Sequence, residues 1–449
     1  MNQKAVAKIA LAALLATGGC ISNDRFGGED PVVSSVSCGP EVIRFDSAKI
    51  WSPDGFRTGN FDVSSGRILE PGDCGRPDRR VDLGGYWLTP PFGDAHSHQL
   101  ESPFLFEQFN HEFIRSGIYY VKNPNAHADL AAATREKAEK PGTVDVAFSM
   151  GGITSRFGHP QGGLALVVSQ YLYPGSSRDD LDGLAFHSVD ALSDIGPVID
   201  RLVEQEADFV KVYLHYSEEY EDRRALVTEQ AVADGLDYSK TKYLFGLDPA
   251  LVEPIVAASH DRGLPVVAHI TTAEDLRIAV NAGVDQLGHL PGAYATTMAD
   301  LTSKRLSGED IALVASSGVT VTATYNARPD LTPEALRDEL AELQRSSISR
   351  LVDAGVSVFL GADAFDQNAA DEYRRWSALN ALDSRALLEL WIETGRNIFP
   401  DRKIGRIEPG YEASFLVFSA DPGIELNALS ALERRVMQGT ELVTPETDE

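Results

Sequence analysis

The sequence has few cysteines, fewer basic than acidic residues, and few long runs of apolar residues. Three cysteines in 449 residues are too few for a disulfide-dense chain. Forty Lys and Arg against 67 Asp and Glu give a formal net charge of −27, which disfavours nucleic acid and anionic membrane surfaces as partners. Apolar residues make up 43% of the chain and charged residues 24%, which excludes a disordered or collagen-like protein. We therefore expect a globular protein.

The first twenty residues are typical of an export signal. Lys4 and Lys8 precede an apolar run at 9–16, and small residues then lead to Cys20. This stretch resembles a bacterial lipoprotein signal, in which Cys20 would be lipidated and become the mature N-terminus; a plain secretory peptide is the alternative. No other run reaches the roughly 18 apolar residues of a membrane span. We expect an exported protein, periplasmic or anchored in the membrane through a lipid on Cys20.

The polar residues 21–39 lack periodicity and predict a tether. If Cys20 carries the lipid, Cys38 and Cys74 remain, and an oxidising compartment would allow them to pair. Two separate buried thiols are the alternative. Because both cysteines belong to the N-terminal part of a predicted small sheet, we expect a disulfide.

Both ends of the chain carry short strand-like segments punctuated by turns. Residues 40–88 contain Pro-Asp-Gly, Ser-Gly and Pro-Gly turns, and residues 401–445 show a similar pattern. Residues 89–400 alternate apolar runs with helix-like stretches, and the runs with the strand leading to Asp94 give eight β units. The predicted fold is α/β: a (β/α)8 TIM barrel with a small β-sandwich formed from both ends. An acidic and polar stretch at 216–246 interrupts the alternation and suggests a functional loop or lid.

Histidines follow several of the predicted strands. His96 and His98 are two residues apart and share one face of an extended segment. His269 and His289 each close an apolar run, and their separation of 20 positions fits one helix with its turns. Since active-site residues of a barrel lie at the carboxyl ends of its strands, we expect the four imidazoles to meet at one mouth.

Two further residues fit the same site. Asp363 follows the last predicted strand and supplies a carboxylate. Lys211 lies within an apolar strand, where an unpaired ammonium is costly to bury. The histidines, this aspartate and this lysine together predict a metal site.

With these residues the chain resembles the amidohydrolase superfamily, specifically its imidazolonepropionase-like and prolidase-like branch. The resemblance covers most of the chain and includes Gly283–His289, Thr394–Asn397 and Gly405–Gly410. The chain departs from the family at 413–415, where Ala-Ser-Phe replaces Ala-Asp-Leu, and at 119–123, where a Tyr-Tyr-Val-Lys-Asn segment replaces a Thr-rich one.

The resemblance implies two divalent ions held by carboxylated lysine, histidine and aspartate. Its ligand set is His96, His98 and Asp363 for one ion, His269 and His289 for the other, and N6-carboxylated Lys211 between them. A hydroxide bridging the ions would be the nucleophile, and Asp363 would act as the catalytic group that orients it and carries its proton to the leaving group. This ligand chemistry suits zinc best, with manganese, cobalt or iron as alternatives.

Residues just beyond the strand ends are candidates for substrate contact. A cation there would pair with a substrate carboxylate, and a tyrosine would donate to a developing oxyanion. A surface or supporting role is the alternative for each residue. The candidates are Lys122, His159, Tyr213, His215, Tyr325 and Arg328.

The predicted function is metal-dependent hydrolysis of an amide or peptide bond in a small molecule, such as a dipeptide or N-acyl amino acid. A second hypothesis is hydrolysis of cyclic amides, lactones or phosphotriesters, because fold and ligands do not fix the leaving group. A third is a lipoprotein that binds a ligand without turnover; Asp363 argues against it, since a pure binder needs no proton carrier. The sequence leaves open whether the chain is a monomer or a homo-oligomer.

Overall fold

The computed structural model describes residues 38–442, except 139, 162–170, 238–239 and 425–427. The predicted export signal, Cys20 and residues 21–37 of the predicted tether therefore lie outside the described residues. Among the described residues, no helix is both long and apolar enough to cross a membrane.

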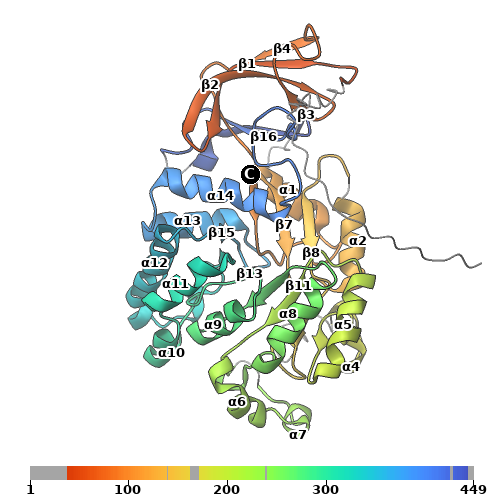
Figure 1. The fold of residues 1–449 in the computed structure, drawn as a ribbon, viewed down its shortest axis with the longest axis vertical. Helices are drawn as coiled ribbons and strands as arrows, with labels where there is room; N and C mark the ends of the chain where they lie inside the picture. The colour runs from red at the N-terminus through yellow and green to blue at the C-terminus, as the bar shows by residue number, and fades with distance from the viewer. Residues whose placement is uncertain (1–37, 139, 162–170, 238–239, 425–427, 443–449) are drawn as a thin grey trace, which may run out of the picture. The chain divides into compact units, whose positions relative to one another are not determined.

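Eight strands from the two ends of the chain form one sheet, as the sequence predicted (Figure 1). From β3 the order runs through β2, β1 and β5 to β16, β17 and β18, with β4 also paired to β1. The N-terminal strand β5 is hydrogen-bonded to the C-terminal strand β16. The strands are β1 (Ile43–Ser52), β2 (Gly55–Ser64), β3 (Arg67–Leu69), β4 (Arg79–Asp82), β5 (Trp87–Thr89), β16 (Phe415–Phe418), β17 (Leu432–Met437) and β18 (Thr440–Leu442).

Three buried phenylalanines join the two ends in the core of this sheet. The ring centroid of Phe45 lies 5.1 Å from that of Phe61 and 5.2 Å from that of Phe415. The contact with Phe415 is edge-to-face, a favourable geometry for aromatic rings. Packing of N-terminal against C-terminal rings explains why neither end forms this sheet alone.

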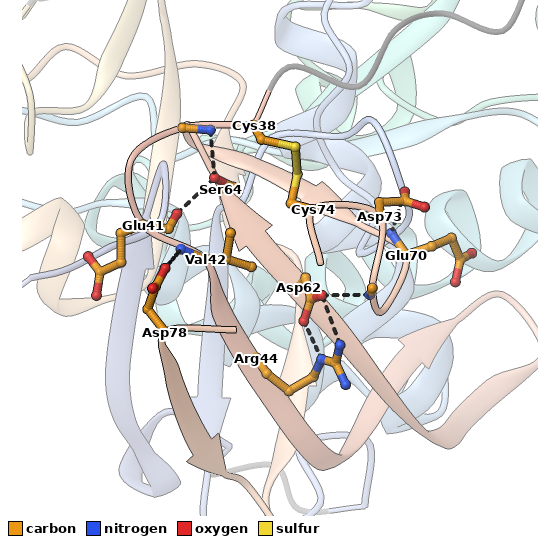
Figure 2. Close-up of a disulfide and its surroundings, with 12 residues drawn as sticks. Cys38, Glu41, Val42, Arg44, Asp62, Ser64, Glu70, Asp73, Cys74 and Asp78 are labelled. Carbon is orange, nitrogen blue, oxygen red and sulfur yellow. Dashed lines mark hydrogen bonds and ion pairs between the residues drawn. A yellow bond between two sulfur atoms is a disulfide. The ribbon is translucent and has the colours of Figure 1, made fainter. Parts of the chain in front are cut away.

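A disulfide joins Cys38, just before β1, to Cys74, in the segment between β3 and β4. This bond confirms the predicted pairing. The two Cα atoms are 5.7 Å apart and the cysteines are separated by 36 residues in sequence. Figure 2 shows the bond near Asp62, whose carboxylate accepts hydrogen bonds from the Arg44 guanidinium and from the backbone N–H of Gly72. The disulfide and Asp62 together fix the loop that leads to Cys74.

The middle of the chain contains parallel strands in two groups. One sheet has the order β6-β7-β8, and the other has the order β10-β9-β11-β12-β13-β14-β15. The N–H of Ala95, just after β6, donates to the carbonyl of Leu360 in β15 (2.9 Å), and the N–H of Asp208, before β11, donates to Phe148 in β8 (2.8 Å). Backbone bonds therefore link the two sheets in two places, from the end of β6 to β15 and from the start of β11 to β8, an arrangement consistent with the predicted barrel. The strands are β6 (Phe92–Asp94), β7 (Ile118–Asn123), β8 (Asp145–Phe148), β9 (Gly152–Thr154), β10 (His187–Ser188), β11 (Val210–Tyr213), β12 (Val266–His269), β13 (Gln286–Leu287), β14 (Thr320–Ala323) and β15 (Val358–Leu360).

Helices lie between most of these strands and cover them (Figure 1). Both faces of the strands are buried, which accounts for their apolar runs. Several helices begin with a capping box, as at Thr272 and Ser307, which fixes where each helix starts. The helices are α1 (Phe106–Arg115), α2 (Ala128–Ala138), α4 (Arg178–Leu181), α5 (Leu192–Glu204), α6 (Tyr220–Leu226), α7 (Glu229–Ala233), α8 (Val252–His260), α9 (Ala273–Asn281), α10 (Met298–Ser303), α11 (Gly308–Ser317), α12 (Arg337–Asp353), α13 (Ala369–Leu379) and α14 (Ser384–Ile398).

The acidic stretch 216–246 contains short helices, including a 3-10 turn (Ser217–Glu219), α6 and α7. Its buried side chains Tyr220, Val227 and Phe245 form a small apolar cluster with Phe157, which follows β9. The stretch, which follows β11, therefore packs against the segment that follows the neighbouring strand β9.

Removal of the disulfide is expected to destabilise the protein. A Cys38→Ser/Cys74→Ser double variant should lose about 2–4 kcal/mol of unfolding free energy, because the cross-link restricts the unfolded chain. Chemical denaturation of the variant and of the oxidised protein measures the difference. The reduced wild-type protein is the control and should match the variant; an oxidised protein no more stable than the variant would contradict the expectation.

Candidate metal centre

One carboxylate lies between the two histidines that follow β6. Oδ1 of Asp363 is 2.8 Å from Nε2 of His98 and 3.2 Å from Nε2 of His96. Asp363 follows β15, and its backbone N–H donates to the carbonyl of His96 (2.7 Å). The hydrogen bonding between the ends of the two strands thus brings residues 267 positions apart into one cluster.

His289, which follows β13, joins the same cluster. Its Nδ1 lies 3.5 Å from Oδ2 of Asp363, and its ring centroid is 4.4 Å from that of His96. One potential ligand atom from each of His96, His289 and Asp363 lies within 4.8 Å of the others. The ring of His269, at the end of β12, is 4.4 Å from that of His289 on the other side.

The Nδ1 atoms of three histidines in this cluster have polar partners. His96 Nδ1 donates to the carbonyl of Gly288 (2.8 Å), His98 Nδ1 contacts Oε1 of Glu101 (2.5 Å), and His289 Nδ1 contacts Oγ1 of Thr324 (2.9 Å). At His96 and His98 this partner orients the ring so that Nε2 faces Asp363, as is typical of metal-binding histidines. At His289 the same Nδ1 atom faces both Thr324 and Asp363. Glu101 and Thr324 were not predicted as part of the site. The three-residue spacing from His98 to Glu101 is a signal in the sequence, whereas nothing in the sequence indicates Thr324.

The protonation states suit metal binding. Burial lowers the pKa of His96 to about 4 and holds the pKa values of His269 and His289 well below their usual range. Burial alone would lower the pKa of His98, but Glu101 and Asp363 on its two sides raise it to about 10. Burial would raise the pKa of Asp363, yet the histidines around it hold that pKa well below its usual range. Neutral imidazoles and an ionised carboxylate are the forms that bind metals, and at His98 a metal ion would replace the proton.

Lys211 in β11 places an amine beside this cluster. The residue is 1% exposed, and its Nζ has no hydrogen-bond partner among the described residues. Burial lowers the pKa of this amine to about 7, although Asp363 opposes the shift. A Cβ atom on Gly288, the residue before His289, would lie 3.0 Å from Nζ, so the amine lies against the segment that carries this histidine. A buried amine without a partner fits carboxylation, since a carbamate would turn a buried cation into an anionic ligand.

Asp94, at the end of β6, is a buried residue that supports the site and was not predicted to do so. Its carboxyl accepts hydrogen bonds from the backbone N–H groups of His96 (3.1 Å), Ala362 (3.2 Å) and Ala369 (2.9 Å). Burial raises its pKa to about 7. Asp94 therefore fixes the start of the His96 segment against the segment that carries Asp363.

Three of the predicted substrate-contacting residues lie beside His269. Their ring centroids lie 4.9 Å (His159), 5.5 Å (Tyr213) and 5.5 Å (His215) from the ring of His269. Tyr213 donates from its hydroxyl to Oδ1 of Asn125 (2.6 Å). The Nε2 atom of His215 is buried and has no hydrogen-bond partner among the described residues. Both His215 and Tyr213 thus lie next to a predicted ligand.

The other three candidates have different partners. Lys122 donates to Oε1 of Gln286 (2.6 Å), Tyr325 is buried in the main hydrophobic core, and Arg328 pairs with the exposed Asp330 (3.3 Å). None of these three contacts involves a predicted metal ligand. Lys122 was expected just beyond a strand end, but β7 extends to Asn123, so Lys122 belongs to the strand and has an interior partner.

The lysine gives a pH-dependent prediction for metal-free protein. Between pH 7 and 10.5 the unfolded chain holds the Lys211 proton and the folded chain does not, so wild-type stability rises with pH in this window. Lys211→Met should therefore raise the unfolding free energy by about 4–5 kcal/mol at pH 6, and by roughly 2–3 kcal/mol less at pH 9. Denaturant titrations of chelator-treated protein at both pH values measure this. A gain that is equal at both values, or a loss of stability at pH 6, would contradict the assigned protonation.

No protein-family model and no curated protein matches the sequence. Solved structures do match over nearly the whole chain. An amidohydrolase is 19% identical with a TM-score of 0.65, covering 90% of this chain and 100% of its own. A Xaa-Pro dipeptidase with bound methionine in its active site is 16% identical with a TM-score of 0.64, and the shares covered are also 90% and 100%. The ochratoxinase of A. niger is 15% identical with a TM-score of 0.66, covering 89% of this chain and 95% of its own. These likenesses show that the chain shares the fold of these structures.

Proposed function

We propose that this protein is a metal-dependent hydrolase of amide C–N bonds in small molecules. The observation that carries the proposal is the meeting of His96, His98 and His289 at the Asp363 carboxylate, beside the Lys211 amine, which has no hydrogen-bond partner among the described residues. Imidazole and carboxylate groups are the ligand types that catalytic zinc prefers. The outer partners on Nδ1 of His96 and His98 also support a metal site rather than a set of buried histidines.

The proposed site holds two divalent ions, most simply zinc. His96, His98 and Asp363 would hold one, His269 and His289 the other, and carboxylated Lys211 would lie between them. Bound ions of this kind supply a nucleophile from water at neutral pH and polarise a scissile carbonyl.

Asp363 is the proposed proton carrier. Its carboxylate is ionised and its side chain is 23% exposed. With the ions bound, this carboxylate would take a proton from the attacking water and deliver it to the leaving nitrogen. The backbone N–H of Asp363 is bound to the carbonyl of His96, which fixes the orientation of this carboxylate relative to the histidines.

Substrate contact is assigned to the His269 side of the site. Tyr213, His159 and His215 present a hydroxyl and imidazole groups there, and the unpartnered Nε2 of His215 is available to a polar group of the substrate. Structural neighbours named as a Xaa-Pro dipeptidase and a phenylurea hydrolase support a C–N bond as the target. We assign a dipeptide or an N-acyl amino acid as the substrate class.

The proposed organisation places this site at the mouth of a (β/α)8 barrel over residues 89–400, with a β-sandwich from residues 40–88 and 401–445. The parallel strand order supports the barrel, and the sheet shared by both chain ends supports a small β-domain built from both of them. We also propose export to the periplasm, with or without a lipid on Cys20. The Cys38–Cys74 disulfide supports this compartment, because disulfides persist where the environment is oxidising.

The proposal predicts a bridging role for Lys211. Purified protein should contain close to two divalent ions per chain by elemental analysis and should hydrolyse members of a panel of dipeptides and N-acyl amino acids. Lys211→Ala should lose this activity, and short carboxylic acids should restore part of it, because they replace the carbamate. Lactones and a phosphotriester complete the panel as alternative substrates. One bound ion together with an unaffected Lys211→Ala variant would contradict the proposal.

Asp363→Asn tests the proton carrier. The amide keeps an oxygen as a ligand but loses its basicity, so kcat should fall by about 10²–10⁴ while KM changes less. Steady-state kinetics and metal analysis on the same preparation measure both. If the variant keeps its metals and its wild-type kcat, Asp363 is not the proton carrier.

A further inference from the structure

Asp275 is a fully buried aspartate outside the predicted ligand set that joins the segments following β11 and β12. Its Oδ2 accepts hydrogen bonds from the backbone N–H groups of Thr271 and Thr272, both at 2.9 Å, in the segment after β12. The same carboxylate accepts hydrogen bonds from the backbone N–H groups of Tyr216 (3.2 Å) and Ser217 (2.9 Å), in the segment after β11. One side chain thus binds four backbone donors from two neighbouring strand ends.

Helix capping explains part of this pattern. Asp275 is the third residue of α9 and forms a capping box with Thr272. Asp310 occupies the same position in α11, forms a capping box with Ser307, and is also buried. Its further side-chain partner is Arg277 on α9 rather than the backbone of a strand-end segment. The bonds to Tyr216 and Ser217 are therefore beyond what a capping box requires.

The segment after β11 needs such support because it turns sharply. Tyr216 has a φ of 53°, in the left-handed region that residues other than glycine rarely adopt. This residue directly follows His215. The bonds from Tyr216 and Ser217 to Asp275 hold the backbone in this conformation and so fix where His215 lies.

In the segment after β12, the hydroxyl of Thr271 contacts both His215 and His269. Thr271, whose N–H binds Asp275, places Oγ1 against Nδ1 of His215 and 3.4 Å from Nε2 of His269. The rings of these histidines have centroids 5.5 Å apart. A shift of Thr271 would therefore move the contacts of both imidazoles.

We propose that Asp275 is a positioning residue, which acts through Thr271 and the turn at Tyr216 to hold His269 and His215 in place. The inference rests on the proposed function in one respect, the assignment of His269 as a metal ligand. Residues that support a ligand from outside typically contribute 10–100-fold to metal affinity.

Zinc affinity measures this role without relying on turnover. Metal-free wild-type, Asp275→Asn, Thr271→Ala and the double variant are titrated with Zn²⁺ against a chromophoric chelator, with Asp310→Asn as the matched capping control. Asp275→Asn should weaken the binding of one of the two ions by about 10–100-fold, whereas Asp310→Asn should remain within about threefold of wild type. Because Asp275 acts through Thr271, the double variant should lose little more than the weaker-binding single variant.

An equal loss in Asp310→Asn, or losses that multiply in the double variant, would show that Asp275 contributes general stability and would overturn the inference. If Asp275→Asn does not fold, Thr271→Ala decides alone, and wild-type zinc affinity in that variant overturns the inference. A wild-type protein that binds two ions but hydrolyses nothing in the panel would reject the proposed function and leave the role of Asp275 to these titrations. A wild-type protein that binds no zinc would reject both.

Discussion

The burial of the Lys211 amine is the constraint on which the rest of the site depends. An amine enclosed by strands, without a hydrogen-bond partner among the described residues, is costly as an ammonium, and burial lowers its pKa to about 7. The nearby groups do not neutralise it with a direct ion pair; they are imidazoles and one carboxylate that is already bound by two of them. Carboxylation and two metal ions would balance the charges of all these groups at once. This explains why an otherwise unfavourable residue lies in the middle of a strand.

Buried carboxylates hold the strand ends around this amine. Asp94 accepts hydrogen bonds from backbone N–H groups in the segments after β6 and after β15. Asp275 joins the segments after β11 and after β12 in the same way. Glu372 on α13 binds the N–H groups of Tyr325 and Asn326 after β14. Loops that carry a site are usually the mobile part of a barrel, so such bonds limit how far the ligands can move. The geometry at Asp363 therefore depends on polar groups that are not ligands themselves.

Much of the site could be predicted from sequence because its residues follow apolar runs at regular spacing. His269 and His289 are 20 positions apart, and the segment between them contains α9 and its turns, as the spacing predicted. The partners of the histidines could not be predicted, because Thr324 and Glu101 act through contacts that depend on how strands neighbour one another. Lys122 shows a different limit: its strand is longer than its apolar run, so a residue expected in a loop contacts Gln286 in the interior. The disulfide was predictable because two cysteines remained once Cys20 was set aside.

Anomalous X-ray diffraction from crystals of the zinc-loaded protein, recorded on both sides of the zinc absorption edge, tests the proposed two-metal site most directly. We expect two zinc peaks on the two sides of Lys211, with His96, His98 and Asp363 at one and His269 and His289 at the other. We also expect continuous electron density for a carboxyl group on Nζ. A single peak bound by histidine and aspartate, with an unmodified Lys211 side chain, would contradict a two-metal site bridged by carboxylated Lys211.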